Sequence, residues 1–343
     1  MKTTTLTHDQ IIEKLIHILE GQKEFLIVTH NNPDPDAIAA ALSLGYLAQQ
    51  LCKINFSIAY GGNIGRSENQ VMVKKLKIKL KRIKQIRFEK YERIALVDTQ
   101  PDSGNHSLLP DSPCHIVVDH HPIRKHHPIE LFVVQPDVGV TTTMLIEWLH
   151  ARQIPIPANL ATAMSYAMIS ETQYLGREST KRDIRAYLSI YPKSNIRTLA
   201  EIIRPKLPQS YFSILSKALG RAVTYRNLAC IHLGDVDAPE IISEMADFIL
   251  RRQQLSWSMC TGRFKQNLII SIRSSNQKAK AHDVIKHLVL NPQDGGGHEM
   301  IAGGFIPLAN NRKEELANVE NRLSEQFAHL LGYDQPDWKP LVE

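Results

Sequence analysis

The first part of the chain shows two patterns of apolar and polar positions, one with helical spacing and one of short apolar runs. Residues 11–19 carry apolar side chains every three or four positions after a capping-box pattern at Thr7 and Gln10, which predicts an amphipathic helix. Helical patterns also occupy 37–51 and 68–76. Short apolar runs bounded by turn or charged residues predict buried strands at Phe25–Val28, Phe56–Ala59, Ile94–Val97, Ile116–Val118 and Leu131–Val134. Such alternation predicts a parallel sheet with helices on both faces.

The pattern changes twice further along the chain. From residue 141 to about 219, helical spacing interrupted by prolines predicts a series of helices. The order then becomes strand, helix, strand and strand, at 228–233, 239–250, 257–264 and 268–272, before a glycine-rich loop at 295–298 and a last helix at 312–331. We therefore predict an α/β protein with a parallel-sheet domain at 1–200, a helical linker at 201–222, a smaller α/β domain at 223–332 and a tail at 333–343.

Composition narrows the class of protein. The 343 residues, 43% of them hydrophobic, suffice for two separate cores. The formal net charge of +6, from 41 Lys and Arg against 35 Asp and Glu, favours an anionic partner. The four cysteines lie far apart and match neither a disulfide framework nor a zinc site. Because apolar stretches stay below the roughly 18 residues that span a bilayer and the first residues are polar, we expect a cytoplasmic protein without a membrane segment.

Acidic and histidine residues gather where predicted strands end. His30, Asp34 and Asp36 follow the first strand and precede a helix, so they lie on the edge where open α/β sheets bind ligands. Two carboxylates so close together repel each other unless a divalent cation lies between them. The alternative is that Asp34 and Asp36 only cap the next helix.

The same pattern recurs at two further strand ends. One strand ends in Asp98 and the next in the triplet Asp119-His120-His121. If the strands are neighbours, these side chains converge on one rim. Imidazole with several carboxylates suits Mn²⁺ or another octahedral divalent ion, and more than four candidate ligands indicate two ions.

Four motifs, taken in order, give the chain a resemblance to a known family. THNNPDPDA, ALVDTQP and VVDHHP resemble the first three motifs of the DHH phosphoesterases, which are named after the triplet, and GGGHEMIAGGF resembles the glycine-rich motif of the DHH-associated C-terminal domain. The resemblance covers nearly the whole chain. It implies a metal-dependent phosphoester hydrolase whose active site lies in the cleft between the two domains.

The resemblance also assigns roles to individual residues. It implies that His30 and Asp34 hold one ion, that Asp36 and His120 hold the other, and that Asp98 bridges both. Catalytic roles fall to His121, facing the substrate phosphate, to the bridging Asp98, and to Asp119, orienting a neighbouring histidine.

A fourth family motif usually supplies an aspartate to the second ion. The matching position here is Glu171, whose carboxylate has a longer stem; it either completes the metal site or is an ordinary polar residue at a helix end. Asp137 is a substitute ligand in principle, although we interpret it as an N-terminal helix cap.

A substrate clamp is implied in the second domain. Gly296, Gly297 and His298 resemble its glycine-rich half, which offers backbone donors to a phosphate. Arg273 and Ser274 resemble the other half, and an arginine can hold a terminal phosphate through two hydrogen bonds. The alternative for Arg273 is a solvated cation at a strand end.

Two further segments have ordinary explanations beside functional ones. The loop at 61–69, with Arg66, either presents donors to an anion or simply joins a strand to a helix. The basic stretch at 74–93 is interpreted as a solvated face rather than a nucleic-acid track.

The leading functional prediction is hydrolysis of small nucleotides. The expected cofactor is Mn²⁺, with two ions, and Mg²⁺ or Co²⁺ as alternatives. The expected substrates are short single-stranded oligonucleotides, linear or cyclic dinucleotides, or 3′-phosphoadenosine 5′-phosphate (pAp), cleaved to mononucleotides. Alternatives are an inorganic pyrophosphatase or polyphosphatase, and a catalytically weak sensor that binds a nucleotide. A homodimer is left open.

Overall fold

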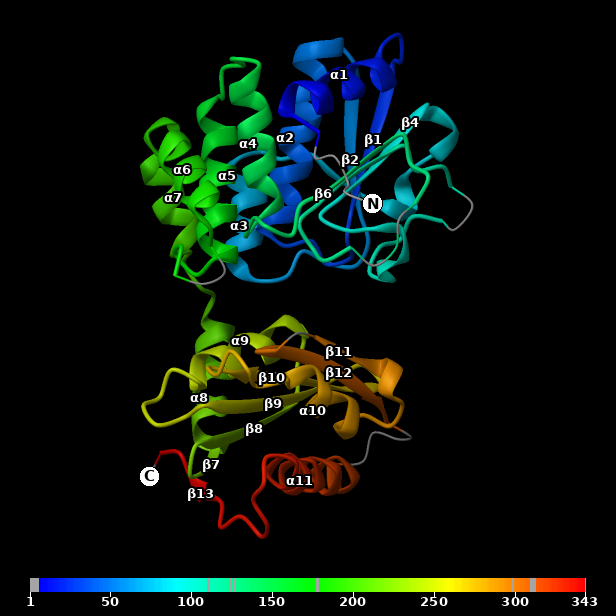
Figure 1. Cartoon of the computed structure of the whole chain (residues 1–343). Helices are drawn as coiled ribbons and strands as arrows, with labels where there is room; N and C mark the ends of the chain where they lie inside the picture. Colours follow the sequence, from blue (N-terminus) through cyan, green and yellow to red (C-terminus); the bar gives the residue numbers. More distant parts are fainter. Residues whose placement is uncertain are drawn as a thin grey trace. The chain divides into compact units, whose positions relative to one another are not determined.

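A computed structural model describes residues 6–109, 112–123, 125, 127–176, 179–297, 299–308 and 313–342. The chain forms two compact units, Met1–Pro205 and Lys206–Glu343 (Figure 1). In the described part of the chain, no helix is long and apolar enough to cross a membrane. The four cysteines are free thiols.

The first unit contains a parallel sheet with the strand order β3-β2-β1-β4-β5-β6. The five strands that the apolar runs predict are confirmed, and β3 is an additional short edge strand within the basic stretch at 74–93. The strands are β1 (Glu24–Thr29), β2 (Asn55–Tyr60), β3 (Leu80–Arg82), β4 (Arg93–Val97), β5 (Ile116–Asp119) and β6 (Leu131–Val134).

Seven helices of the described residues belong to this unit. The first begins at a true capping box, because Thr7 and Gln10 each bond the other's backbone N–H. The second is buried on almost all sides, and its alanines at 37 and 39–41 permit this close packing. The helices are α1 (His8–Leu19), α2 (Pro35–Cys52), α3 (Ser67–Lys75), α4 (Thr141–Ala151), α5 (Ala158–Glu171), α6 (Lys181–Ile190) and α7 (Ile196–Ile203).

The two faces of the first sheet are covered differently. On one face, Phe25 and Ile27 of β1 belong to a core with the apolar sides of α1, α2, α4 and α5. On the other face, Leu26 and Val28 pack against residues from loops and 3₁₀ turns between 83 and 129, including Ile83. Among the described residues, the expectation of helices on both faces is therefore wrong. The connections from β3 to β4 and from β5 to β6 are loops and short turns instead of helices.

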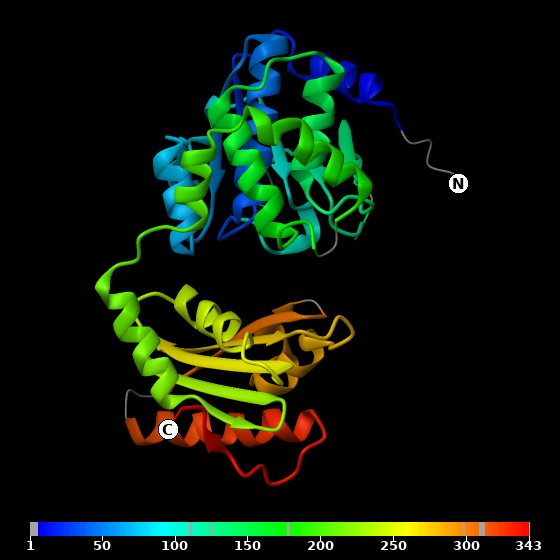
Figure 2. The ribbon, with the colours of Figure 1, turned by 90° about the vertical axis from the view of Figure 1, so that its left-hand side faces the viewer.

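The second unit contains a mixed sheet with the order β11-β12-β10-β9-β8-β7-β13, in which only β8 and β9 pair in parallel. The cores place α8 and α9 on one face and α10 and α11 on the other, as Figure 2 shows for α9 and α11. The elements are α8 (Gln209–Arg221), β7 (Val223–Tyr225), β8 (Leu228–Asp235), α9 (Glu240–Ile249), β9 (Trp257–Phe264), β10 (Asn267–Ser274), α10 (Ala281–Leu288), β11 (Gly295–Gly297), β12 (Ile301–Pro307), α11 (Lys313–Leu330) and β13 (Lys339–Pro340).

One prediction for the second unit is wrong. The glycines at 295–297 were expected to form a loop, but they form the edge strand β11, paired with β12. An added Cβ at Gly297, where φ is +153°, would lie 2.2 Å from the carbonyl oxygen of Ile301. At Gly304, on the paired strand, it would lie 2.8 Å from the carbonyl oxygen of Asp294. These two glycines are therefore required by close backbone packing within the hairpin.

Strand register brings the predicted ligands to one level. Thr29 pairs with Val97 across β1 and β4, and Val97 pairs with Val118 across β4 and β5. The next residue in each strand is His30, Asp98 or Asp119. Since parallel strands end at the same edge of a sheet, these residues start their loops side by side.

Candidate metal centre

Asp98 lies at the middle of the site. It follows β4 in the left-handed conformation, with φ of +59°, and its amide donates to the carbonyl oxygen of Val118 at 2.9 Å. A left-handed conformation costs a residue other than glycine on the order of 1 kcal/mol. The side chain is only 2% exposed. The backbone turns sharply at this residue and directs a buried carboxylate along the rim.

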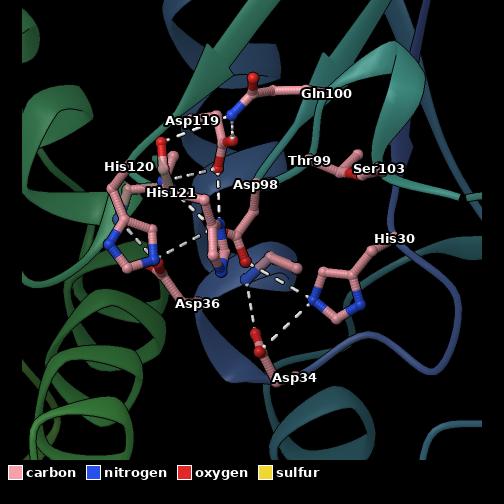
Figure 3. A network of polar contacts seen from close by, with 12 residues as sticks. His30, Asp34, Asp36, Asp98, Thr99, Gln100, Ser103, Asp119, His120 and His121 are labelled. Carbon is pink, nitrogen blue, oxygen red and sulfur yellow. Dashed lines mark hydrogen bonds and ion pairs between the residues drawn. The ribbon is translucent and has the colours of Figure 1, made fainter. Parts of the chain in front are cut away.

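The two oxygens of Asp98 face different partners (Figure 3). His30 Nε2 lies 3.5 Å from Oδ2 of Asp98 and 3.4 Å from Oδ2 of Asp34. On the other side, His120 Nε2 lies 3.6 Å and His121 Nδ1 3.8 Å from Oδ1 of Asp98. Asp98 therefore belongs to two sets of potential metal ligands. Within each set, the potential ligand atoms all lie within 4.8 Å of one another.

Asp36 lies beside these sets and caps a helix far away in the sequence. Its Oδ2 accepts from the amide of Thr141 at 2.7 Å and its Oδ1 from the amide of Thr142 at 2.9 Å, both in the first turn of α4. The N-cap of that helix, Val140, provides no side-chain acceptor. The carboxylate thus satisfies donors that every helix start leaves open. Each oxygen keeps a second lone pair for a cation.

Asp34 begins the neighbouring helix in the usual way. Its Oδ1 accepts from the amide of Ala37 at 2.9 Å, as an N-cap of α2, while its Oδ2 faces His30. The cap interpretation and the ligand interpretation are therefore compatible for this residue, because they use different oxygens.

Glu171 ends α5 close to the same carboxylates. Burial, together with the negative charges of Asp34, Asp36 and Asp98, raises the pKa of Glu171 to about 8. Its side chain lies outside the two sets that share Asp98. Its raised pKa nevertheless shows that the negative charges of the three aspartates act on the Glu171 carboxyl group.

Asp119 supports the histidine that follows it. Its Oδ1 lies 2.8 Å from Nδ1 of His121 and accepts from the amide of the same residue at 3.2 Å. Gln100 holds its other oxygen, donating from Nε2 to Oδ2 at 2.7 Å and to the carbonyl oxygen of Pro122 at 3.2 Å. Burial opposes a charged imidazole, but Asp119 and the charge of Asp98 raise the pKa of His121 to about 9.

The charge balance of the centre fits a divalent cation. Within the described residues, no lysine or arginine forms an ion pair with Asp34, Asp36, Asp98 or Glu171. Burial and the nearby carboxylates raise the pKa of Asp36 well above its usual range. Burial opposes a charged His30, yet Asp34 and Asp98 raise the pKa of His30 to about 12. A cation would replace that proton, because a metal-bound imidazole is neutral. The donors are nitrogen and oxygen, which suits a hard or borderline ion.

The predicted clamp residues all belong to the second unit. Arg273 is 7% exposed, and its Nε donates to Asp247 Oδ1 at 2.8 Å. Ser274 is buried and donates to the carbonyl oxygen of Ser256 at 2.9 Å. Gly296 has open space around its Cα, whereas Gly297 is packed against the next strand. His298 lies outside the described residues.

Three residues of the centre were not anticipated, and one prediction was wrong. Gln100, Thr141 and Thr142 donate hydrogen bonds to the rim carboxylates. Of the three, only Gln100 lies within one of the family-like motifs, ALVDTQP. Asp137 is not a helix cap, because Val140 occupies that position in α4. Instead, the largely exposed Asp137 accepts from Arg182 Nη1 at 2.8 Å.

Two relatives are similar to this chain in sequence. An uncharacterized protein of Methanocaldococcus jannaschii is 32% identical over 93% of this chain and 66% of its own length. A protein of Enterococcus faecalis named probable manganese-dependent inorganic pyrophosphatase is 30% identical over 48% of this chain and 53% of its own length. The matched region therefore spans about two thirds of the length of the Methanocaldococcus relative and about half of the length of the Enterococcus relative.

A solved structure shares the fold. The crystal structure of an exopolyphosphatase-related protein from Bacteroides fragilis has a TM-score of 0.76 with 17% identity, and it covers 96% of this chain and 100% of that chain. Models of two families match in order: the DHH family N-terminal domain at residues 24–168 and the DHHA1 domain at 226–325. With both domains present, the chain belongs to the DHH family.

Proposed function

We propose that this chain is a manganese-dependent phosphoester hydrolase that acts on small nucleotides. The main observation behind this proposal is the position of Asp98. One of its oxygens faces His30, which also contacts Asp34, and its other oxygen faces His120. A single buried carboxylate between two sets of ligands is the geometry that a pair of ions a few ångströms apart needs. The name of the Enterococcus relative supports manganese as the ion.

The chain's own residues divide the work around the two ions. His30 and Asp34 would hold one ion, Asp36, His120 and Glu171 the other, and Asp98 both. When bound, the ions lower the pKa of a water to near neutrality and neutralise charge on the phosphate. The carboxylates of Asp36 and Asp34 keep their positions because Thr141 and Thr142 donate to the first and Ala37 donates to the second.

His121 would act on the substrate side of the centre. Its ring is half-exposed, unlike the buried Asp119 that holds its Nδ1. With Nδ1 fixed, Nε2 is the ring nitrogen left to donate to a phosphoryl oxygen. A positive imidazole there would stabilise the charge that builds up during the attack of water.

The second unit supports a nucleotide as substrate. A cavity of about 280 Å³ is lined by Ile242, Ile269 and Ile301, by the backbone of Gly303 and Gly304, and by Arg273. Two serines, Ser243 and Ser271, add hydroxyl groups to the lining. Largely apolar walls with a few polar groups and one cation match a flat base that carries a phosphate. A pyrophosphate ion has no apolar part, so these isoleucines would contribute nothing to its binding.

An inorganic pyrophosphatase or polyphosphatase is the second candidate. The observation in its favour is the name of the Enterococcus relative, whose similarity covers 48% of this chain. The metal centre alone does not distinguish the two substrates, because both present a phosphoryl group to the ions.

A substrate panel tests both candidates. The full chain, loaded with Mn²⁺, is incubated with the linear dinucleotide pApA, cyclic di-AMP, pAp, pyrophosphate and a short polyphosphate, and product release is measured by chromatography. We expect kcat/KM to be highest for a nucleotide. A higher kcat/KM for pyrophosphate would favour the second candidate. Tight nucleotide binding without turnover of any compound would indicate a sensor instead.

The Asp98 carboxylate provides the decisive variant. Asp98→Asn keeps the shape but removes the shared charge, and we expect activity to fall by at least about 1,000-fold. Asp137→Asn is the matched control, since this aspartate lies in the same unit but pairs with Arg182. Full activity of Asp98→Asn would contradict the proposal.

A further inference from the structure

A second cavity lies in the C-terminal unit, lined by residues that the hydrolase proposal does not use. It has a volume of about 520 Å³, which falls in the range of small-molecule sites. Its walls come from α8, from the ends of β8 and β9, and from α11. The lining residues include the cations Lys217, Arg221 and Arg263.

Two of these cations converge on one glycine. Gly234 has φ of +66°, and a Cβ added there would lie 3.2 Å from Arg221 Nη1 and 3.7 Å from Lys217 Nζ. The two cations are also one turn apart on α8. Like charges at this spacing destabilise a helix unless something neutralises them.

The carboxylates of the cavity act on this pair only through space, because each has another direct partner. Asp235 is bound to Arg263 through both of its oxygens, at 2.5 and 2.8 Å. Glu320 is buried and accepts from Thr261 Oγ1 at 3.2 Å. Within the described residues, neither Lys217 nor Arg221 forms an ion pair with any carboxylate.

The electrostatics of the wall agree with an open place for negative charge. Burial and the charge of Arg221 lower the pKa of Lys217. Burial raises the pKa of Glu320, which favours the neutral carboxyl. His232 completes the wall, and its two ring nitrogens are occupied by Thr261 Oγ1 and Ser324 Oγ, each at 2.8 Å.

We infer that this cavity binds a phosphate group through Lys217 and Arg221, carried either by inorganic phosphate or by a small phosphate ester. An arginine offers several donors in a fixed fork, and a lysine beside it adds a compact charge, a combination that matches the several oxygens of one phosphate. The absence of a side chain at Gly234 leaves room for the anion to reach both cations. The site lies entirely within the second unit and needs no metal ion.

The test separates this site from the metal centre. The full chain is treated with a chelator, so that the metal centre has no ions to hold an anion, and is titrated calorimetrically with inorganic phosphate, 5′-AMP and adenosine. We expect about one phosphate per chain, weaker binding at higher salt, and no binding of adenosine. Similar affinities for phosphate and 5′-AMP would identify the free anion as sufficient. Tighter binding of 5′-AMP would identify the ester.

Substitutions in and outside the cavity test whether phosphate binds there. Lys217→Gln combined with Arg221→Gln should weaken phosphate binding at least about 10-fold. Lys286→Gln removes the same charge from the exposed face of α10 and should leave it unchanged. Ala317→Leu keeps both cations and narrows the cavity from α11, so it should also weaken binding.

The outcome does not depend on hydrolysis. Thermal unfolding of each variant shows whether the fold is kept, and Ala317→Leu is a mild change because leucine is a good helix former. The inference is overturned if the chelated wild-type chain binds no phosphate at about 10 mM, or if the double variant binds as tightly as the wild type. Loss of binding in Lys286→Gln would equally overturn it, since that residue lies outside the cavity.

Discussion

Oγ1 of Thr141 donates to Oδ1 of Asp98 at 2.7 Å, and the amide of the same residue donates to Asp36. The first residue of α4 therefore bonds two carboxylates, one from α2 and one from the loop after β4. Helix α4 also packs against α2. This single residue ties the orientation of the metal centre to the packing of the helical layer.

Replacing Thr141 should weaken metal binding without unfolding the chain. Thr141→Val removes the bond to Asp98 and should lower Mn²⁺ affinity about 10- to 100-fold. Thr141→Ser keeps a hydroxyl that can make this bond and should retain the wild-type Mn²⁺ affinity. Calorimetric titration with Mn²⁺ measures the change. Thr143→Val is the control, because Thr143 lies on the same helix as Thr141 but its hydroxyl donates to the buried Asp183 of α6, at 2.6 Å. Equal Mn²⁺ affinity in both valine variants would rule out the proposed role.

The second ion should depend on Glu171. Glu171→Gln keeps the size of the side chain but removes its charge, and we expect the number of Mn²⁺ ions bound tightly to fall from two to one. Glu171→Asp supplies the aspartate usual in the family and should retain both ions. The ratio of ions to chain is measured by equilibrium dialysis. Glu147→Gln is the control, since this glutamate pairs with Arg182. Two tightly bound ions in Glu171→Gln would remove this residue from the ligand set.

Gln100 should act through Asp119 as a positioning residue. Gln100→Ala removes the bond to Asp119 and the bond to Pro122, which frees the loop that carries His121. We expect kcat to fall about 10- to 100-fold with little change in Mn²⁺ affinity, because small displacements of a reacting group are costly. Gln70→Ala, which removes an exposed side-chain bond to Ile64, should change neither quantity. A parallel loss of Mn²⁺ affinity and thermal stability in Gln100→Ala would point to a purely structural role.

The stability of the chain should fall in mild acid because of His232. Burial and the charge of Arg221 lower the pKa of this imidazole from 6.5 to about 4. The unfolded chain therefore binds a proton at a higher pH than the folded one does. The stability contributed by neutral His232 is fully present above about 6.5 and is lost as the pH falls towards about 4. Urea unfolding of the chelated chain across this range measures the slope.

Two histidine variants separate this contribution from the rest. His232→Gln should flatten the dependence of the unfolding free energy on pH between about 4 and about 6.5. His329→Asn should not, because that imidazole is exposed beside Asp334. A slope in His232→Gln as steep as that of the wild type would assign the acid sensitivity to other groups.

The strands and the ligands at their ends are predictable because both depend on local sequence. Runs such as Ile94–Val97 are apolar, lie between polar neighbours and form strands at those positions. Asp98 and Asp119 stand at the ends of such runs, so alignment of parallel strands is enough to bring them together. The convergence of charge on one rim follows from these two regularities.

Glycine segments carry less local information. Residues 295–297 have no side chains to alternate, so their sequence cannot distinguish a loop from a strand. Pairing with β12 decides the matter, because its backbone supplies the hydrogen bonds. The same limit applies to β3, whose three residues are too few for a pattern.

The sequence alone therefore determined the parallel strands of the first unit, the position of the rim and the acidic and histidine residues on it, because these follow from spacing within short segments. The tertiary structure decided what each carboxylate contacts. Asp36 bonds amides more than 100 residues away, and Gln100, in the loop after β4, bonds Asp119 at the end of β5. Such partners depend on how helices and loops pack over the strand ends, and packing is a property of the whole domain rather than of any spacing along the chain.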